Sequence, residues 1–303
     1  MREVDMGHIS GMVFAGCLAL LSGSASAECS PLPGWEAVSK AAEGKFLIFG
    51  EIHGTEQSPT AFGEYVCAVS GDEPVLVAVE LSAFYNEGLQ TAWQASPKEF
   101  RAALLDKVEE LQKRIDGVGS VSMISMLTKL HALKADGADI DIVAFNGARD
   151  AAQLEKFSDL PGQEPHESAQ AYNIRIAAAE RDYRHVVVLV GGVHAAKHEF
   201  SFGGEPWKAM ALKLAPDDEV ISLVQRDSGG DAWNCRMPDE VDGEHLKAED
   251  IQCAPFETFA DDGIDGEARM AFWAENDTVD ERYDGYFFLG PTTASPPAFS
   301  AKE

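Results

Sequence analysis

The chain has 303 residues, 45% of them hydrophobic, and it carries 24 Lys and Arg against 51 Asp and Glu. This length and apolar fraction suit one large α/β domain with a sizeable core, and they exclude a wholly disordered or collagen-like chain. The formal net charge of −27 argues against a nucleic-acid partner, which needs a concentrated basic surface, and against docking on an anionic membrane.

The first 27 residues have the pattern of a secretory signal peptide. The apolar run 12–21 is too short to span a bilayer, and Ala25-Ser26-Ala27 forms an A-x-A cleavage pattern. We therefore expect cleavage after Ala27 and a periplasmic or secreted protein. The alternative is a lipoprotein acylated at Cys17, since Phe14-Ala15-Gly16-Cys17 resembles a lipobox. No other segment has the ~20 apolar residues of a spanning helix, so no membrane span is predicted.

Four cysteines remain after the expected cleavage, namely Cys29, Cys67, Cys235 and Cys253. An even number in an oxidising compartment favours disulfides over metal thiolates. Their separations along the chain favour Cys29–Cys67 with Cys235–Cys253, and free buried thiols are the alternative.

Short β-branched runs alternate with helical patterns along the mature chain. The first, second and fourth runs are almost continuously apolar, which is typical of strands buried on both faces. The predicted strands cover residues 45–49, 74–79, 139–145, 185–190, 219–224 and 286–289, and the predicted helices cover residues 100–115, 121–135 and 167–183. This alternation predicts an α/β fold with a single, mostly parallel central sheet and helices on both faces.

The expected α/β domain spans residues 28–291 and contains an acidic, loop-rich insertion at 227–284, followed by a flexible tail at 292–303. The Cys235–Cys253 disulfide would staple this insertion. Because the insertion follows the fifth strand, we expect it to begin at the carboxyl edge of the sheet. The insertion is then either a lid or a solvated surface segment. In the lid, the apolar contacts that hold it down would come from Trp233, Phe256, Phe259 and Trp273.

The segment Gly50-Glu51-Ile52-His53 has the strongest chemical signal in the chain. It follows a buried strand, and ligands of parallel sheets bind beyond the carboxyl ends of the strands. A Glu and a His two residues apart in extended chain point the same way. Two further apolar strands also end at a side chain of this kind, one at Glu80 and the other at Gly191-Gly192-Val193-His194. A buried carboxylate such as that of Glu80 needs a partner.

Glu51, His53, Glu80 and His194 are therefore the predicted site. Two imidazoles with one or two carboxylates suit a divalent ion such as Zn, Mn or Fe with an open position for water. The bound water becomes a nucleophile near neutral pH, and the spare Glu serves as general base. Two alternatives remain open, which are water activation by His53 or His194 without a metal and a hydrogen-bonded core network without catalysis.

The motifs Gly50-Glu51-Ile52-His53-Gly54-Thr55 and Gly191-Gly192-Val193-His194, with the strand end at Glu80, resemble the erythromycin esterase/ChaN-like superfamily, which includes the Tiki and TraB-like proteins. The resemblance covers about residues 45–290, and the single residue between Glu51 and His53 is closest to the haem-binding ChaN group. It implies either a metal-dependent hydrolase of an ester or amide or a haem or iron carrier without turnover.

The resemblance also extends to a segment before the second His motif. Members often carry Arg-Asn or Arg-Asp there, and this chain has Tyr172-Asn173-Ile174-Arg175, so Asn173 matches while the preceding Arg is absent. The implied cofactor-binding residues are therefore Tyr172, Asn173 and Arg175, with Tyr172 as a haem-iron ligand if haem binds. A small molecule or a peptide is the expected substrate, and the sequence leaves the oligomeric state open.

Overall fold

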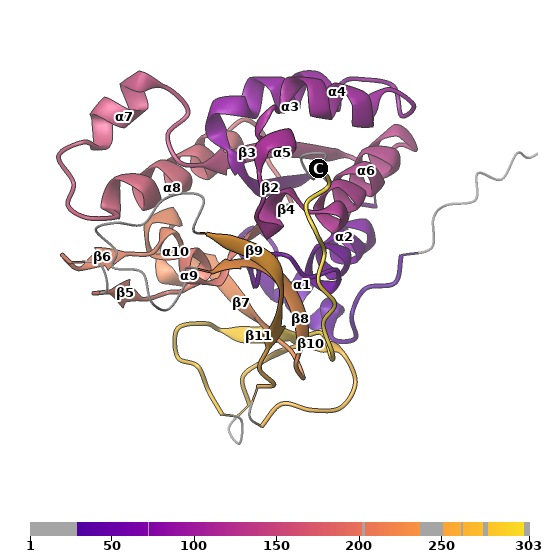
Figure 1. Ribbon diagram of the computed structural model, residues 1–303, viewed down its shortest axis with the longest axis vertical. Coiled ribbons are helices and arrows are strands. Elements are labelled where there is room, and N and C mark those ends of the chain that lie inside the picture. Colours follow the sequence, from indigo (N-terminus) through magenta and orange to yellow (C-terminus); the bar gives the residue numbers. More distant parts are fainter. Residues whose placement is uncertain are drawn as a thin grey trace, which may run out of the picture.

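A seven-stranded sheet forms the centre of the protein (Figure 1). The computed structural model describes residues 29–71, 73–201, 204–236, 251–261, 263–274 and 278–299. The strand order is β10-β11-β7-β1-β4-β2-β3, with β10 antiparallel to β11 and the other neighbours parallel. The strands are β1 (Phe46–Glu51), β2 (Val75–Ser82), β3 (Ile140–Asn146), β4 (His185–Gly191), β7 (Val220–Arg226), β10 (Arg269–Phe272) and β11 (Gly285–Phe288). The predicted mostly parallel α/β sheet is confirmed.

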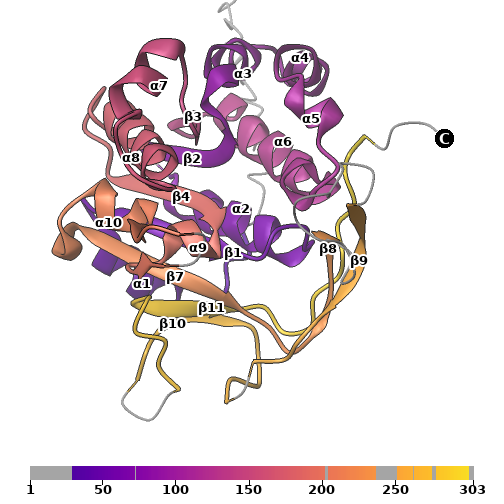
Figure 2. The same ribbon diagram turned by 60° about the vertical axis from the view of Figure 1, so that its left-hand side comes forward.

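Helices cover both faces of this sheet, as Figure 2 shows. The helices are α1 (Trp35–Ala42), α2 (Gln57–Val69), α3 (Asn86–Trp93), α4 (Phe100–Lys107), α5 (Glu110–Lys113), α6 (Val121–Ala135), α7 (Ala151–Phe157), α8 (Glu164–Ala178), α9 (Gly192–Ala195) and α10 (Met210–Leu214). Helices α2 and α6 pack together over one face, and α8 and α10 pack together over the other.

Two hydrophobic clusters explain why the central strands are almost entirely apolar. In β1, Leu47 and Phe49 join the cluster under α2 and α6, whereas Ile48 joins the cluster under α8 and α10. Successive side chains of a strand point to opposite faces, so a strand between two helical layers needs apolar residues at every position. This packing holds the carboxyl ends of the central strands at one rigid edge.

Two of the three predicted helices have different bounds in the structure. The expected helix at 100–115 is interrupted at Val108, which has φ −115° and ψ 73°, because the chain turns there to bury that side chain completely. The expected helix at 167–183 begins three residues earlier as α8, with Pro165 in its first turn, and ends at Ala178. Helix α6 covers the predicted residues 121–135.

Both predicted disulfides are present, Cys29–Cys67 and Cys235–Cys253. Two disulfides are typical of proteins that fold in an oxidising compartment. The second one joins the two-stranded hairpin of β8 (Gly230–Arg236) and β9 (Gln252–Thr258). A further small pair consists of β5 (Glu199–Phe200) and β6 (Trp207–Lys208). Across the described ranges, no helix is long and apolar enough to cross a membrane.

The C-terminal segment differs from the expected flexible tail in its described part. Residues 292–299 run along the edge of the site, where Ser295 N donates to Gly54 O across 2.7 Å and Ala298 N donates to Gly119 O across 2.9 Å. The sequence offers no periodic pattern here, and these backbone hydrogen bonds fix the segment instead. The expected signal peptide, residues 1–27, lies outside the described residues.

Candidate active site

The three chain segments that carry the predicted site residues meet at one edge of the sheet. Strand β4 lies between β1 and β2, and Glu51 of β1 is in register with Gly191 of β4. The carboxyl ends of these strands are therefore adjacent. The structure thus brings together the four predicted side chains, which are Glu51, His53, Glu80 and His194.

His53 is held by the carboxylate of Glu51. The distance from His53 Nδ1 to Glu51 Oε1 is 2.9 Å, and Glu51 is buried. The residue between them is fixed as well, because Ile52 N donates to the side-chain oxygen of Gln225 on β7 across 2.9 Å. The other oxygen of Glu51, Oε2, is buried without a hydrogen-bond partner among the described residues. Such an atom is suited to a bound cation or water.

Glu80 lies between the two predicted imidazoles. Its Oε2 is 3.3 Å from His53 Nε2, and its Oε1 is 3.8 Å from His194 Nε2. The backbone amide of Gly191 also donates to Oε2, across 2.7 Å. One carboxylate therefore faces the Nε2 atom of both histidines.

A fifth residue, Glu167 of α8, completes the arrangement and was missed in the sequence. Its Oε1 is 2.8 Å from His194 Nδ1, and its Oε2 accepts the backbone amide of Met210 across 2.7 Å. With an exposure of 1%, it is among the most buried carboxylates described. The sequence signal was a charge within an Ala-rich helix, but which face of that helix meets the sheet depends on tertiary packing.

The electrostatics of the site follow from this alternation of acids and imidazoles. Burial by itself lowers the pKa of His53, but the charges of Glu80 and Glu51 raise it well above the usual 6.5. Burial likewise lowers the pKa of His194, and Glu167 and Glu80 raise it. Burial raises the pKa of Glu80, but His53 and then His194 lower it to about 2. These groups therefore stabilise one another's charged forms.

A third imidazole, that of His166, lies beside His194. The two ring centroids are 5.7 Å apart, and His166 Nε2 is 3.0 Å from the amide nitrogen of Gln170. Burial lowers the pKa of His166. Within the described part of the chain, His166, Glu167 and His194 offer ligand atoms that lie within 4.8 Å of one another, which is a possible second donor group for a metal ion.

The residues implied as cofactor-binding lie elsewhere. Asn173 is buried, and its amide nitrogen donates to the carbonyls of Phe145 and Gly147, so it fixes the end of β3. The ring of Tyr172 packs against α7, with Lys156 Nζ 3.7 Å from its centroid. Arg175 is exposed and donates to the carbonyl of Lys213. None of the contacts named for these three residues is with the acid–imidazole site.

One of the four aromatic residues expected to hold down the acidic segment 227–284 reaches the site, and Tyr283 of the same segment donates from its hydroxyl to Gly192 O, two residues before His194, across 2.9 Å. Trp233 of β8 donates from its backbone to Gly54 O, next to His53, across 2.9 Å. Phe256 packs under Arg236, Trp273 packs on Tyr286, and Phe259 is 85% exposed. The segment therefore begins at the carboxyl edge of the sheet, as expected, and residues 237–250 lie outside the described ranges.

Comparison with solved structures identifies the fold. A mutant of the erythromycin esterase EreC in its open conformation superposes with a TM-score of 0.52 at 10% identity, covering 89% of this chain and 95% of that one. A succinoglycan biosynthesis protein gives 0.55 at 12% identity, with 86% and 91% covered. A protein from Bacillus cereus gives 0.55 at 10% identity, with 86% and 92% covered. No protein-family model matches the sequence, and no curated protein matches it. At 12% identity or less, these similarities show that the chain shares the fold of the erythromycin esterase EreC and of the other two structures.

Proposed function

We propose that this protein is an exported, metal-assisted hydrolase of an ester or amide, with Glu51, His53, Glu80 and His194 as its reactive groups. One observation carries the proposal. The Nδ1 atom of His53 contacts the carboxylate of Glu51, and the Nδ1 atom of His194 contacts that of Glu167. The Nε2 atoms of both histidines face the carboxylate of Glu80. The structural similarity to an erythromycin esterase supports a hydrolase-like fold.

The donor set fits a divalent metal ion. Histidines that ligate metals typically donate their other ring N–H to a carboxylate, which fixes the tautomer and the ring orientation. Here the Glu51 carboxylate is the acceptor for His53 Nδ1, and the Glu167 carboxylate is the acceptor for His194 Nδ1. His53, His194 and Glu80 would then hold the ion, a two-His, one-carboxylate set that suits Zn, Mn or Fe. When bound, the ion supplies Lewis acidity and lowers the pKa of a coordinated water toward neutrality.

The protein's own groups orient the reactants. Glu51 keeps the His53 ring in place from its Nδ1 side, and its Oε2 has no hydrogen-bond partner among the described residues. Glu80 is fixed by the Gly191 amide and keeps both Nε2 atoms directed to one point. The acidity of the chain, with a net charge of −27, favours neutral or cationic substrates over anionic ones.

The test combines metal analysis with kinetics on the purified mature protein. We expect one divalent ion per chain, hydrolysis of 4-nitrophenyl esters or aminoacyl 4-nitroanilides, loss of turnover after chelation and recovery on adding Zn, Mn or Fe(II). His53→Ala and His194→Ala should each remove metal and activity. His198→Ala, an exposed histidine four residues beyond His194, is the control and should retain both. Metal-free protein with full activity would contradict the metal, and full activity in both alanine variants would contradict the site.

The haem or iron carrier is the alternative that the resemblance leaves open. No contact of Tyr172 among the described residues favours it, because its ring packs against α7. A haem absorbance titration on the same sample tests this alternative, and a saturable shift of the haem absorbance without any turnover would support it.

A further inference from the structure

The β8–β9 hairpin is joined to the loop that carries His53. Trp233 N donates to Gly54 O across 2.9 Å, and Ser295 N donates to the same oxygen across 2.7 Å. Gly54 has φ 78°, and a Cβ at this residue would stand 2.1 Å from Trp233 O. Only glycine allows both this backbone conformation and this close approach. The hairpin backbone therefore fixes the residue that follows His53.

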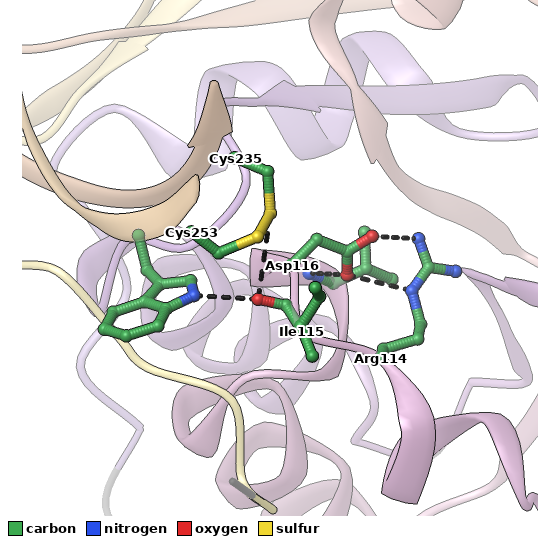
Figure 3. The surroundings of a disulfide bond; sticks show 7 residues. Arg114, Ile115, Asp116, Cys235 and Cys253 are labelled. Atoms are coloured by element: carbon green, nitrogen blue, oxygen red, sulfur yellow. Dashed lines mark hydrogen bonds and ion pairs between the residues drawn. A yellow bond between two sulfur atoms is a disulfide. The ribbon is translucent and has the colours of Figure 1, made fainter. Parts of the chain in front are cut away.

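The side chain of the same tryptophan holds a second segment of the site. Trp233 Nε1 donates to Ile115 O across 2.9 Å, and Cys235 Sγ lies 3.8 Å from that oxygen (Figure 3). Ile115 separates Arg114 from Asp116, whose side chains form a two-point ion pair with distances of 2.9 Å and 2.8 Å. Trp233 therefore contacts the backbone between the two members of this pair.

The Arg114–Asp116 segment lies at the rim of the acid–imidazole site. A Cβ on Gly117 would stand 2.2 Å from Gly54 N and 2.7 Å from His53 C, so the two backbones are in direct contact. On the other side, Glu110 Oε1 accepts the amide of Ser82, two residues after Glu80, across 2.6 Å. The 110–117 segment thus spans the distance between the Glu80 strand and the His53 loop.

The disulfide gives the hairpin the rigidity that this contact needs. A two-stranded hairpin is marginally stable by itself in water. Cys235 and Cys253 stand directly opposite each other in the β8–β9 register, with their Cα atoms 4.0 Å apart. The bridge therefore holds the two strands together only two residues from Trp233.

We propose that Trp233, held by the Cys235–Cys253 disulfide, is a positioning residue for the hydrolytic site. Its backbone N–H fixes the His53 loop, and its indole N–H fixes the Arg114–Asp116 segment against that loop. The expected effect of Trp233 on turnover rests on the proposed function. The structural part of the proposal, the coupling of these two segments, is independent of any activity.

Two changes test the proposal on the full mature chain. Trp233→Phe retains an aromatic ring and the backbone hydrogen bond but removes the indole donor. We expect faster amide hydrogen exchange at 112–119 and a roughly tenfold lower kcat with KM nearly unchanged, since small displacements of reacting groups cost rate. Cys235→Ser with Cys253→Ser should accelerate exchange at both 52–57 and 112–119 and lower kcat further.

The matched control is removal of the other disulfide, by Cys29→Ser with Cys67→Ser. Its 38-residue loop is longer than the 18-residue loop of Cys235–Cys253, so this variant should lose more thermal stability while retaining kcat and slow exchange at 52–57 and 112–119. Unchanged exchange in the Trp233 and Cys235/Cys253 variants, or an equal loss of kcat in the control, would overturn the positioning role. If no ester or amide is turned over by the unmodified protein, the proposed function fails, and the exchange data alone decide the positioning role.

Discussion

The backbone amide of Gly191 donates a hydrogen bond to Glu80 across 2.7 Å, from N to Oε2, and so joins the carboxyl ends of β4 and β2. The same glycine makes room for His53, because a Cβ at position 191 would stand 2.9 Å from His53 Nε2 and 3.6 Å from Glu80 Oε2. The absence of a side chain at Gly191 is therefore a condition for the His53–Glu80 contact.

Gly191→Ala should displace His53 while leaving the fold intact. The backbone at this residue has φ −56° and ψ 143°, which alanine adopts without strain, so the effect is steric. We expect activity to fall by about 10- to 100-fold with a small change in the melting temperature. Gly71→Ala is the control, since nothing lies within 4 Å of its added Cβ. Equal activity in the two variants would show that His53 has another position available.

Glu167→Gln should weaken the site, although no role for Glu167 was predicted from the sequence. The amide preserves the shape but removes the charge that faces His194 Nδ1 at 2.8 Å. Loss of such a carboxylate next to a metal-ligating histidine typically costs about 10- to 100-fold in metal affinity or activity. Metal titration and initial rates measure this directly. Glu155→Gln, an exposed change on α7, should have no effect, and a normal metal affinity in Glu167→Gln would remove Glu167 from the site.

Acid should destabilise the protein partly through His131. This side chain is 3% exposed and stacks on Phe100, with ring centroids 4.0 Å apart. Burial, and then the charge of Lys134, lower its pKa below 6.5. The unfolded chain therefore binds the proton more readily, so stability is lost as the pH falls below 6.5 toward the folded-state pKa.

In His131→Leu we expect the free energy of unfolding to depend less on pH than in the unmodified protein. Urea unfolding at pH 7 and pH 5 should give a decrease in the free energy of unfolding that is smaller in this variant than in the unmodified protein. His198→Gln, at an exposed position, is the control and should behave like the unmodified protein. An identical decrease in all three proteins would exclude His131 as the cause.

Export and disulfide formation are testable by mass. Expressed with residues 1–27 in a bacterial host, the protein should accumulate in the periplasm or medium with Glu28 as its N-terminus. Peptide mapping without reductant should recover Cys29 joined to Cys67, Cys235 joined to Cys253, and no free thiol. An N-terminus acylated at Cys17 would instead establish the lipoprotein.

The sequence alone predicted six of the seven strands of the central sheet, both disulfide pairings and four side chains that the structure brings together, but not β10 or the β8–β9 hairpin, which lie in the segment expected to be loop-rich. Continuous apolar runs such as the one before Glu51 are local signals, because a strand buried on both faces requires an apolar residue at each position. Parallel strands share one carboxyl edge whatever their order, so residues that follow them, such as His53 and His194, can be placed at the same edge of the sheet without knowledge of the topology. Short separations between the paired cysteines were enough to choose the disulfide partners.

Tertiary structure decided everything that depends on which faces and loops meet. The insertion of β4 between β1 and β2 directs both imidazoles toward Glu80. Packing of α8 on the sheet turned Glu167 toward His194 and gave Asn173 a structural contact with the end of β3 instead of a place in the site. Trp233 meets Ile115 across 118 residues of chain. Such contacts are set by the burial of the whole helix or hairpin, and a local sequence pattern does not encode that orientation.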